Sequence, residues 1–323
     1  MERVNILAPS RLHFGLLNET GMLGRVDGGI GVSLVDPHWE LEVTRGEHFL
    51  RGVTLCSEHA AAVQSALDVL SFLIPPAQVG ITVNSTVPCH AGLGSKTSLL
   101  LAIGKAVSTL ANTPISETDL CRLLRRGGTS GVGLYSFKGG KFVWDAGHRY
   151  PEFKNTFGPS SSCLAPPPPA ILSIPVDWLQ VVHFRFANGG LHGEDEANLF
   201  KQSCPIAEAE TLTLISCVVS EIVPALMERD ELLLQRGVKR LQTLGFKKIE
   251  WDIQDPVTQR FRQYWEHSDA TEALGLSSLG PTLFTFTTRS SAVRSLIDKF
   301  ETAALHVSVT NVNNRGALIK GIV

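Results

Sequence analysis

A glycine-rich turn is the feature of this sequence with the clearest chemistry. Residues 87–98 read VPCHAGLGSKTS, between an alternating strand-like run and a long apolar run typical of a helix. A strand, a glycine turn and a helix start direct backbone N–H groups toward a phosphate. Gly92 and Gly94 let the backbone approach a ligand closely. The sequence therefore predicts a phosphate-binding loop at this turn.

Polar side chains in the same turn add hydrogen-bond donors and charge. Ser95 and Thr97 supply hydroxyl groups and Lys96 supplies a positive charge. The spacing is not that of a Walker A loop, because His90 and Ser95 stand where that motif requires glycine. The alternative is a plain helix start, with Ser95 as N-cap and the lysine in solvent.

Two early segments combine glycine with charged residues. In the segment 9–15, Arg11 and His13 alternate with apolar residues, so we expect both side chains on one face of a strand. A second glycine-rich segment, 24–31, contains Arg25 and Asp27. A solvated sheet face and an ordinary loop are the respective alternatives.

Three later segments are also candidates for ligand binding. The segment 125–133 offers a cation, hydroxyls and glycine turns suited to an anion, through Arg126, Gly128, Thr129 and Ser130. A turn of small residues at 276–282 includes Ser277 and Ser278. The acidic run 192–196 includes Glu194, which is a candidate ligand for magnesium or a ribose hydroxyl. Its alternative is simple complementarity to the helix dipole.

Composition restricts the classes of function. The chain has 323 residues, 43% of them hydrophobic, and a net charge of −2, which does not favour binding to nucleic acid or an anionic membrane. No apolar run is expected to reach the length of a membrane span, and no signal peptide is expected. The six cysteines show no metal-binding spacing, so we expect reduced thiols in a cytoplasmic protein.

The elements that must position these segments follow from periodicity and turn residues. Mixed strands and helices without strict alternation predict an α+β fold. A Pro- and Ser-rich connector at 151–169 predicts a division into segments 1–169 and 170–323. Strands are expected over 4–7, 12–17, 31–34, 39–43, 79–84, 179–186, 283–287 and 305–309. Helices are expected over 57–72, 95–110, 116–126, 207–227, 230–244, 256–267 and 291–302. A hairpin is expected with strands 134–137 and 141–144.

The turn at 88–95 and the Gly-Pro-Thr turn at 275–282 together resemble the GHMP kinase superfamily. The resemblance implies a two-domain fold: a ribosomal-protein-S5-like N-terminal domain carrying the phosphate loop and a C-terminal α/β sandwich. Many of these kinases carry a catalytic aspartate shortly after a Pro-Ser-Gly turn. Gly133 stands at that position here, and glycine cannot accept a proton.

A narrower branch fits more segments. The segments 11–16, 24–31, 92–97, 126–133 and 277–282 are similar, in the same order, to the β-ribofuranosylaminobenzene 5′-phosphate synthase family. The resemblance implies condensation of phosphoribosyl pyrophosphate with 4-aminobenzoate or 4-hydroxybenzoate, releasing CO₂ and pyrophosphate, in tetrahydromethanopterin biosynthesis. It also implies magnesium (Mg²⁺), a homodimer and a cytoplasmic location.

The reaction suggests a role for each candidate. We expect Lys96, the 92–97 turn and Arg126 with its turn to bind pyrophosphate. Arg11 or Arg25 is then available for the 5′-phosphate. We expect Asp27 or Glu194 to stabilise the ribose cation or hold the metal. His13 is the candidate for the proton on the para substituent.

Two other functions stay open. An ATP-dependent small-molecule kinase would need another carboxylate, Asp145 or Asp27. A non-catalytic binding or regulatory member of the superfamily would bind ligand without turnover.

Overall fold

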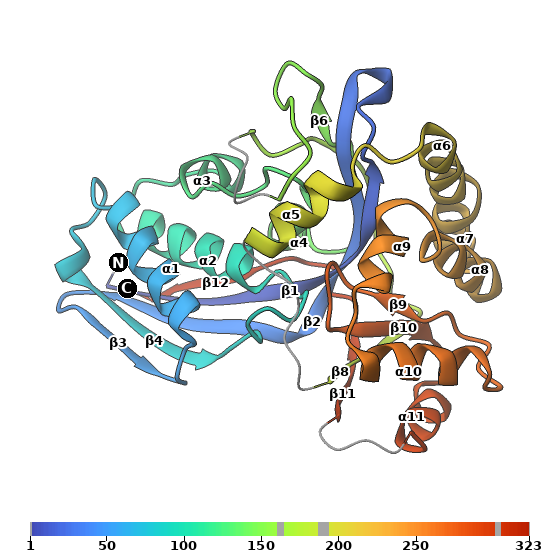
Figure 1. The fold of residues 1–323 in the computed structure, drawn as a ribbon. Helices are drawn as coiled ribbons and strands as arrows, with labels where there is room; N and C mark the ends of the chain where they lie inside the picture. The colour runs from blue at the N-terminus through green and yellow to red at the C-terminus, as the bar shows by residue number, and fades with distance from the viewer. Residues whose placement is uncertain (1, 160–164, 187–193, 301–304, 323) are drawn as a thin grey trace.

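The computed structural model describes residues 2–159, 165–186, 194–300 and 305–322 (Figure 1). Its first layer is a mixed sheet with helices on one face, and its second is a smaller sheet with its own helices. This arrangement confirms the predicted α+β class.

The first sheet has the strand order β12-β1-β2-β4-β3, with β5 and β6 pairing with β2, and β7 with β5. Only the described pair β3–β4 is parallel in this sheet. The strands are β1 (Arg3–Asn18), β2 (Arg25–Arg45), β3 (Phe49–Gly52), β4 (Val79–Ser85), β5 (Phe142–Asp145), β6 (His148–Arg149), β7 (Ala170–Ile174) and β12 (Leu318–Ile322). Four helices belong to this layer: α1 (Ser57–Val69), α2 (Ser95–Leu110), α3 (Glu117–Leu123) and α4 (Val132–Gly139). Helices α2 and α4 pack on β1 and β2, while α1 and α3 pack on α2.

The second sheet has the order β11-β8-β10-β9. Its strands are β8 (Gln180–Phe186), β9 (Gly275–Leu276), β10 (Leu283–Thr287) and β11 (Leu305–Asn311). The helices of this half are α5 (Glu194–Ser203), α6 (Glu208–Cys217), α7 (Val223–Glu228), α8 (Glu231–Leu241), α9 (Gly245–Asp252), α10 (Pro256–Glu266) and α11 (Ser290–Asp298). A hydrophobic cluster joins β8 and β10 to α10 and α11.

The long strand β1 links the two layers. It pairs with β2 along its length, with register shifts at Pro9/Ser10 and His13/Gly15. Phe14 stacks on Phe284 of β10 with ring centroids 5.1 Å apart. The residues of β1 between and beside these shifts, including Arg11 and His13, therefore lie where the two layers meet.

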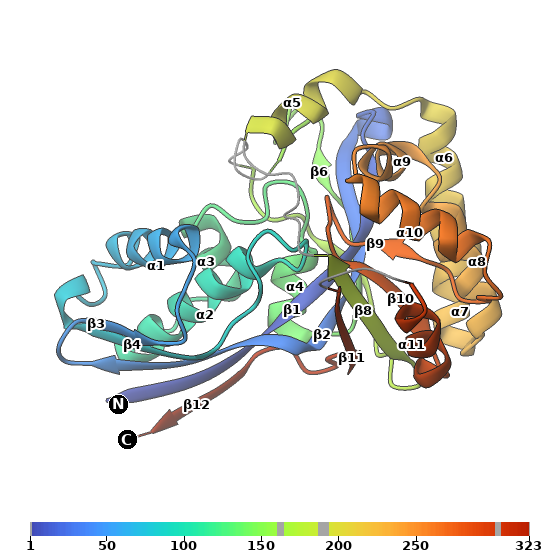
Figure 2. The same cartoon turned by 60° about the horizontal axis from the view of Figure 1, so that its bottom comes forward.

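Chain order does not follow the two layers throughout. Strand β7 begins at residue 170 and pairs with β5, and β12 returns from the end of the chain to pair with β1. Figure 2 shows the described ends of the chain side by side along this pair. The predicted division after residue 169 stays a prediction. In both pairings, a strand that follows residue 169 pairs with a strand that precedes it.

Most predicted elements are present, and one pattern was misread. The expected hairpin is wrong, because residues 132–139 form α4 and only the second segment is a strand. Val132, Leu134 and Phe137 are buried, on a helix packed against β1 and α2. An apolar run this short fits either a strand or a buried helix, so packing decided the outcome.

We expected no stretch as long and apolar as a membrane span, and one helical stretch does reach that length and hydropathy. The helical stretch Glu208–Glu228 has 21 residues and a mean hydropathy of 1.5 over its best window, of which 44% is buried. Leu214, Cys217 and Ile222 in this stretch belong to the main hydrophobic core. Glu221, in the same stretch, pairs with Arg240 at 3.0 Å. These contacts are typical of a helix in a protein interior.

Candidate functional site

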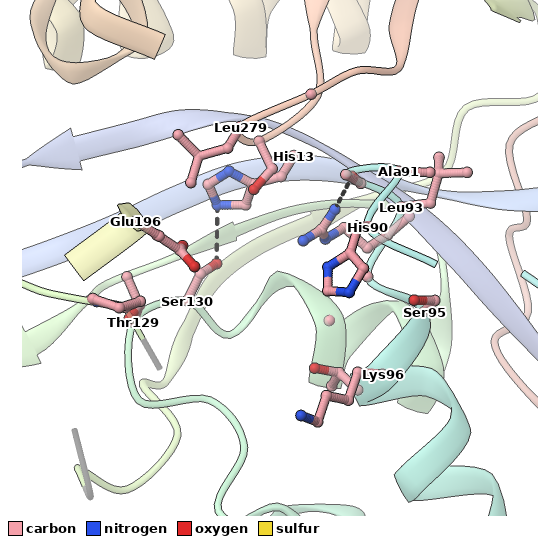
Figure 3. Close-up of a pocket in the computed structure, with 18 of the residues that line it drawn as sticks. His13, His90, Ala91, Leu93, Ser95, Lys96, Thr129, Ser130, Glu196 and Leu279 are labelled. Carbon is pink, nitrogen blue, oxygen red and sulfur yellow. Dashed lines mark hydrogen bonds between the residues drawn. The ribbon is translucent and has the colours of Figure 1, made fainter. Parts of the chain in front are cut away.

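A cavity of about 430 Å³ opens between the phosphate loop (residues 87–98), β1 and the turn at residues 276–282, which we call the late serine loop. Figure 3 shows His13 and Ser130 on one side and the loop residues 90–96 on the other. Eleven of the sixteen predicted site residues line this cavity: Arg11, His13, Gly92, Gly94, Ser95, Lys96, Thr97, Arg126, Thr129, Ser130 and Ser278. The sequence motifs thus converge on one site from segments far apart in the chain.

The predicted phosphate loop precedes an uncapped helix. The N-cap of α2 is Gly94, in a left-handed conformation, and no side chain caps this helix. The alternative in which Ser95 is the N-cap is therefore wrong, since Ser95 is the first helical residue. No acidic residue lies in the first turn of this 16-residue helix. Its N–H groups and its dipole favour an anion in the cavity.

Two arginines face the same cavity. Arg11 donates a hydrogen bond to the carbonyl oxygen of Gly92, and Arg126 Nε donates to Thr97 Oγ1 at 3.0 Å. Burial, with the charge of Arg126, lowers the pKa of Arg11 to about 10. Burial also lowers the pKa of Arg126. An anion bound in the cavity would therefore stabilise the charged form of both guanidinium groups.

Lys96 lies at the cavity rim in an ionic group. Its Nζ is 3.2 Å from Glu58 Oε1, and the other oxygen of Glu58 contacts His90 Nε2. The lysine side chain is 43% exposed. Lys96 therefore contributes positive charge at the mouth of the cavity, partly balanced by Glu58.

His13 belongs to a hydrogen-bonded chain that ends on a buried carboxylate. Its Nε2 lies 3.2 Å from Ser130 Oγ, which donates to Asp145 Oδ2 at 2.9 Å. Because the single hydroxyl proton of Ser130 goes to Asp145, the histidine Nε2 must be the donor in the first bond. The ring then keeps Nδ1 as an acceptor. Burial, with the charge of Arg11, lowers the pKa of His13 well below its ordinary value, so the ring is neutral.

Asp145 is held within this network rather than exposed to the cavity. It also accepts hydrogen bonds from the backbone N–H groups of Gly131 and Gly147, both at 2.9 Å. Burial raises the pKa of Asp145 to about 6. Gly133 does line the cavity, and a Cβ there would lie 3.1 Å from Thr97 Cγ2. The structure thus leaves little room for a kinase-type aspartate at position 133.

The late serine loop is clamped onto the phosphate loop. Ser277 Oγ donates to the Gly92 carbonyl oxygen at 2.7 Å and accepts from the backbone N–H of His13 at 3.0 Å. Lys247 of α9 donates to the carbonyl oxygens of Leu276 and Ser278, each at 3.1 Å. Ser277 therefore fixes the cavity wall from behind, while Ser278 faces the cavity.

Five predicted residues do not line the cavity: Arg25, Asp27, Gly128, Glu194 and Ser277. Asp27 is fully enclosed, with His148 Nδ1 at 2.5 Å and Lys154 Nζ at 2.7 Å. Arg25 donates to the carbonyl oxygens of Ala146 and Gly147. Both side chains therefore have their polar partners within the fold and not in the cavity. The glycine-rich sequence pattern contains no sign of these partners.

The acidic run contributes a different carboxylate from the expected one. Glu194 is exposed at the start of α5, and Glu196 lines the cavity instead. Figure 3 shows the Glu196 carboxylate on the same side as Thr129 and Ser130. His192 and Gly193, in the same run, lie outside the described residues. Sequence reasoning also missed Glu58 and Glu250, which line the cavity from α1 and α9.

Comparisons with known proteins identify the family of this chain. The family model "GHMP kinases N terminal domain" matches residues 57–137. β-Ribofuranosylphenol 5′-phosphate synthase of Archaeoglobus fulgidus is 34% identical, over 98% of this chain and 99% of its own. The synthase of that name from Methanocaldococcus jannaschii is 31% identical, over 96% of this chain and 98% of its own. The chain belongs to the β-ribofuranosylphenol 5′-phosphate synthase family.

Solved structures support the fold of this family member. A homoserine kinase from Cytophaga hutchinsonii aligns with a TM-score of 0.66 at 16% identity, covering 99% of this chain and 98% of the other. A mevalonate diphosphate decarboxylase from Enterococcus faecalis aligns with a TM-score of 0.63 at 17% identity, covering 99% of both chains. The predicted GHMP kinase-like fold is therefore confirmed.

Proposed function

We propose that this family member transfers the ribosyl 5-phosphate group of phosphoribosyl pyrophosphate to 4-hydroxybenzoate, with loss of CO₂ and pyrophosphate. The observation that carries this proposal is the pair of partly buried arginines beside an uncapped helix start, without a kinase base at Gly133. The names of the curated relatives specify a ribofuranosylphenol product, which favours the hydroxy acid over 4-aminobenzoate.

The proposed bond changes balance without a further reactant. The bond from ribose C1 to the pyrophosphate oxygen breaks, and C1 bonds to the ring carbon that bears the carboxylate. The ring-to-carboxylate bond then breaks, CO₂ leaves, and its electron pair restores aromaticity. The hydroxyl para to this carbon donates electrons during the attack.

The departing diphosphate needs cationic and N–H stabilisation as its charge increases. Arg126 supplies a guanidinium group, and the start of α2 supplies backbone donors. Lys96 adds charge at the rim. With Arg25 bound to backbone carbonyl oxygens, Arg11 is the better candidate of the two for the 5′-phosphate. Arg11 and Arg126 both line the cavity, so we assign the two phosphate-bearing ends of one substrate to them.

His13 is suited to the para hydroxyl of the acceptor. The ring is neutral and donates Nε2–H to Ser130, so Nδ1 is the acceptor that remains. A hydrogen bond from the phenol to this nitrogen would increase electron donation into the ring. Ser130 and Asp145 keep the tautomer fixed and act as positioning residues.

Magnesium is part of the proposal, with a different ligand from those expected. Asp27 is neutralised within the fold and Glu194 does not line the cavity. Glu196 lines the cavity, and its charge raises the pKa of both Arg11 and Arg126. Magnesium is commonly held by one or two carboxylates together with substrate phosphates, and when bound it would neutralise diphosphate charge. The proposed cytoplasmic location, homodimer and role in tetrahydromethanopterin biosynthesis come from the family resemblance.

Release of pyrophosphate tests this function directly. Protein incubated with magnesium, phosphoribosyl pyrophosphate and 4-hydroxybenzoate should release pyrophosphate only when both substrates are present. The kinase alternative has the support of the fold shared with a homoserine kinase. It predicts that no pyrophosphate is released and that ATP stabilises the protein. A response to ATP alone would overturn the proposal.

A further inference from the structure

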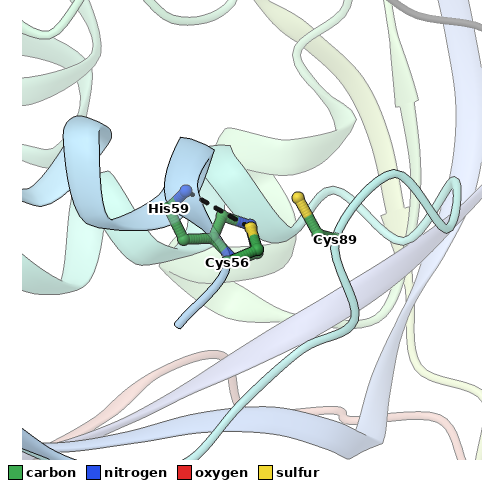
Figure 4. A group of neighbouring side chains, drawn as sticks. All are labelled: Cys56, His59 and Cys89. Carbon is green, nitrogen blue, oxygen red and sulfur yellow. Dashed lines mark hydrogen bonds between the residues drawn. The ribbon is translucent and has the colours of Figure 1, made fainter. Parts of the chain in front are cut away.

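Two cysteines and a histidine meet beside the phosphate loop. Cys56, His59 and Cys89 each present one ligand atom, and these atoms all lie within 4.8 Å of one another. Figure 4 shows Cys56 and His59 at the start of α1, with Cys89 reaching them from the loop after β4. Cys56 is the N-cap of α1, and its sulfur accepts from the His59 backbone N–H at 3.4 Å.

The donor set selects a soft divalent cation. Thiolate sulfur and imidazole nitrogen are preferred ligands of Zn²⁺, whereas Mg²⁺ prefers oxygen. Two cysteines and one histidine leave one position open in a tetrahedral site. Glu58 and His90 stand beside that position, since they form a second group of candidate ligands that shares Cys89.

The histidine is already oriented for metal binding. His59 Nε2 lies 3.0 Å from Ser95 Oγ in the protein interior, which leaves Nδ1 for a metal. Metal-binding histidines ordinarily use their second nitrogen in such a bond, which fixes the tautomer and the ring plane.

We propose that Cys56, His59 and Cys89 bind Zn²⁺ and thereby tie the phosphate loop to the start of α1. Both thiols lose their protons to solvent on binding, so two thiolates balance the charge of the ion. A neutral site of this kind does not compete with the arginines for the diphosphate. Its effect is positional, because Cys89 lies in the same loop as Gly92 and Gly94.

Metal content and cobalt spectroscopy test the site without any activity assay. Protein purified without chelator should contain one zinc per chain by mass spectrometry, and Cys56→Ser and Cys89→Ser should each lose it. Apo protein titrated with Co²⁺ should develop thiolate-to-cobalt charge-transfer absorption, which each serine variant weakens. Ser95→Ala, which removes the partner of His59, should reduce metal affinity about 10- to 100-fold.

Cys204→Ser is the matched control, because Cys204 is a half-buried free thiol outside the cluster. It should retain zinc and the full cobalt spectrum. Circular dichroism of each variant verifies folding, and the titration of wild-type apo protein gives an answer even where a variant does not fold. Wild-type protein that binds neither metal would overturn the proposal. So would a disulfide between Cys56 and Cys89 in protein isolated with zinc present.

Discussion

Arg126→Ala removes the guanidinium group that we infer binds the diphosphate. Arg126 donates to Thr97 beside the start of α2, and its charge contributes to the lowered pKa of Arg11. Without ligand, the substitution relieves repulsion between two partly buried charges, so the pKa of Arg11 should rise from about 10. With ligand, the variant lacks a charge-assisted hydrogen bond.

The expected size follows from typical energies of such bonds. A hydrogen bond to a charged group contributes about 1.5–3 kcal/mol, so pyrophosphate should bind about 10- to 100-fold more weakly. At a pyrophosphate concentration about 100 times the wild-type Kd, binding stabilises the fold by about 2.7 kcal/mol. The same concentration should stabilise the variant by only about 1.4 to 0.4 kcal/mol.

Denaturant unfolding with and without pyrophosphate measures this difference. Arg122→Ala is the matched control, because this arginine lies on α3 with its side chain 55% exposed and pairs with Asp119 at 2.7 Å. The control should retain the full stabilisation. Full stabilisation of Arg126→Ala would refute the assignment of the diphosphate to this cavity wall.

Three further predictions concern binding, stability and pH. Gly94→Ala should abolish the binding of phosphoribosyl pyrophosphate measured by calorimetry. The reason is that φ of Gly94 is +69° and the new Cβ would lie 3.0 Å from the Arg11 side chain. Gly139→Ala is the control and should bind normally, because no atom lies within 4 Å of its new Cβ. Asp27→Asn should lower the free energy of unfolding by about 3–5 kcal/mol, since it breaks a buried ion pair; a loss below about 1 kcal/mol would contradict this. Asp145 has its pKa raised from 3.8 to about 6, so the folded state binds more protons in that window. As pH rises from about 4 to above 6, the free energy of unfolding of the wild type should therefore fall by up to about 3 kcal/mol relative to that of Asp145→Asn. If the difference between wild type and Asp145→Asn does not change with pH, Asp145 does not titrate in this range.

Local motifs made much of the site predictable. The phosphate loop, the Arg126 turn and the late serine loop are each short segments whose glycines and hydroxyls indicate their chemistry before any folding. The alternation around Arg11 and His13 correctly indicated a shared face, because both side chains line the cavity. These features depend on residues that are neighbours in the chain, so they can be predicted from the sequence alone.

Residues whose roles depend on distant partners were not predictable. Asp27 has the same glycine-rich surroundings as a ligand-binding acid, yet Lys154, 127 positions away, neutralises it. The choice between Glu194 and Glu196 depends on where α5 begins relative to the cavity. The proposed zinc ligands were not predictable either, since Cys56 and Cys89 lack a recognisable spacing and meet only through the packing of α1 against the loop.

Labelled CO₂ release is the most direct test of the central claim. Carboxyl-labelled 4-hydroxybenzoate should release labelled CO₂ only with phosphoribosyl pyrophosphate and magnesium, in equal amount to the pyrophosphate formed. Arg126→Ala should slow this release, and Arg122→Ala should not. Pyrophosphate formation without CO₂ release, or no release with both substrates present, would contradict the proposed reaction.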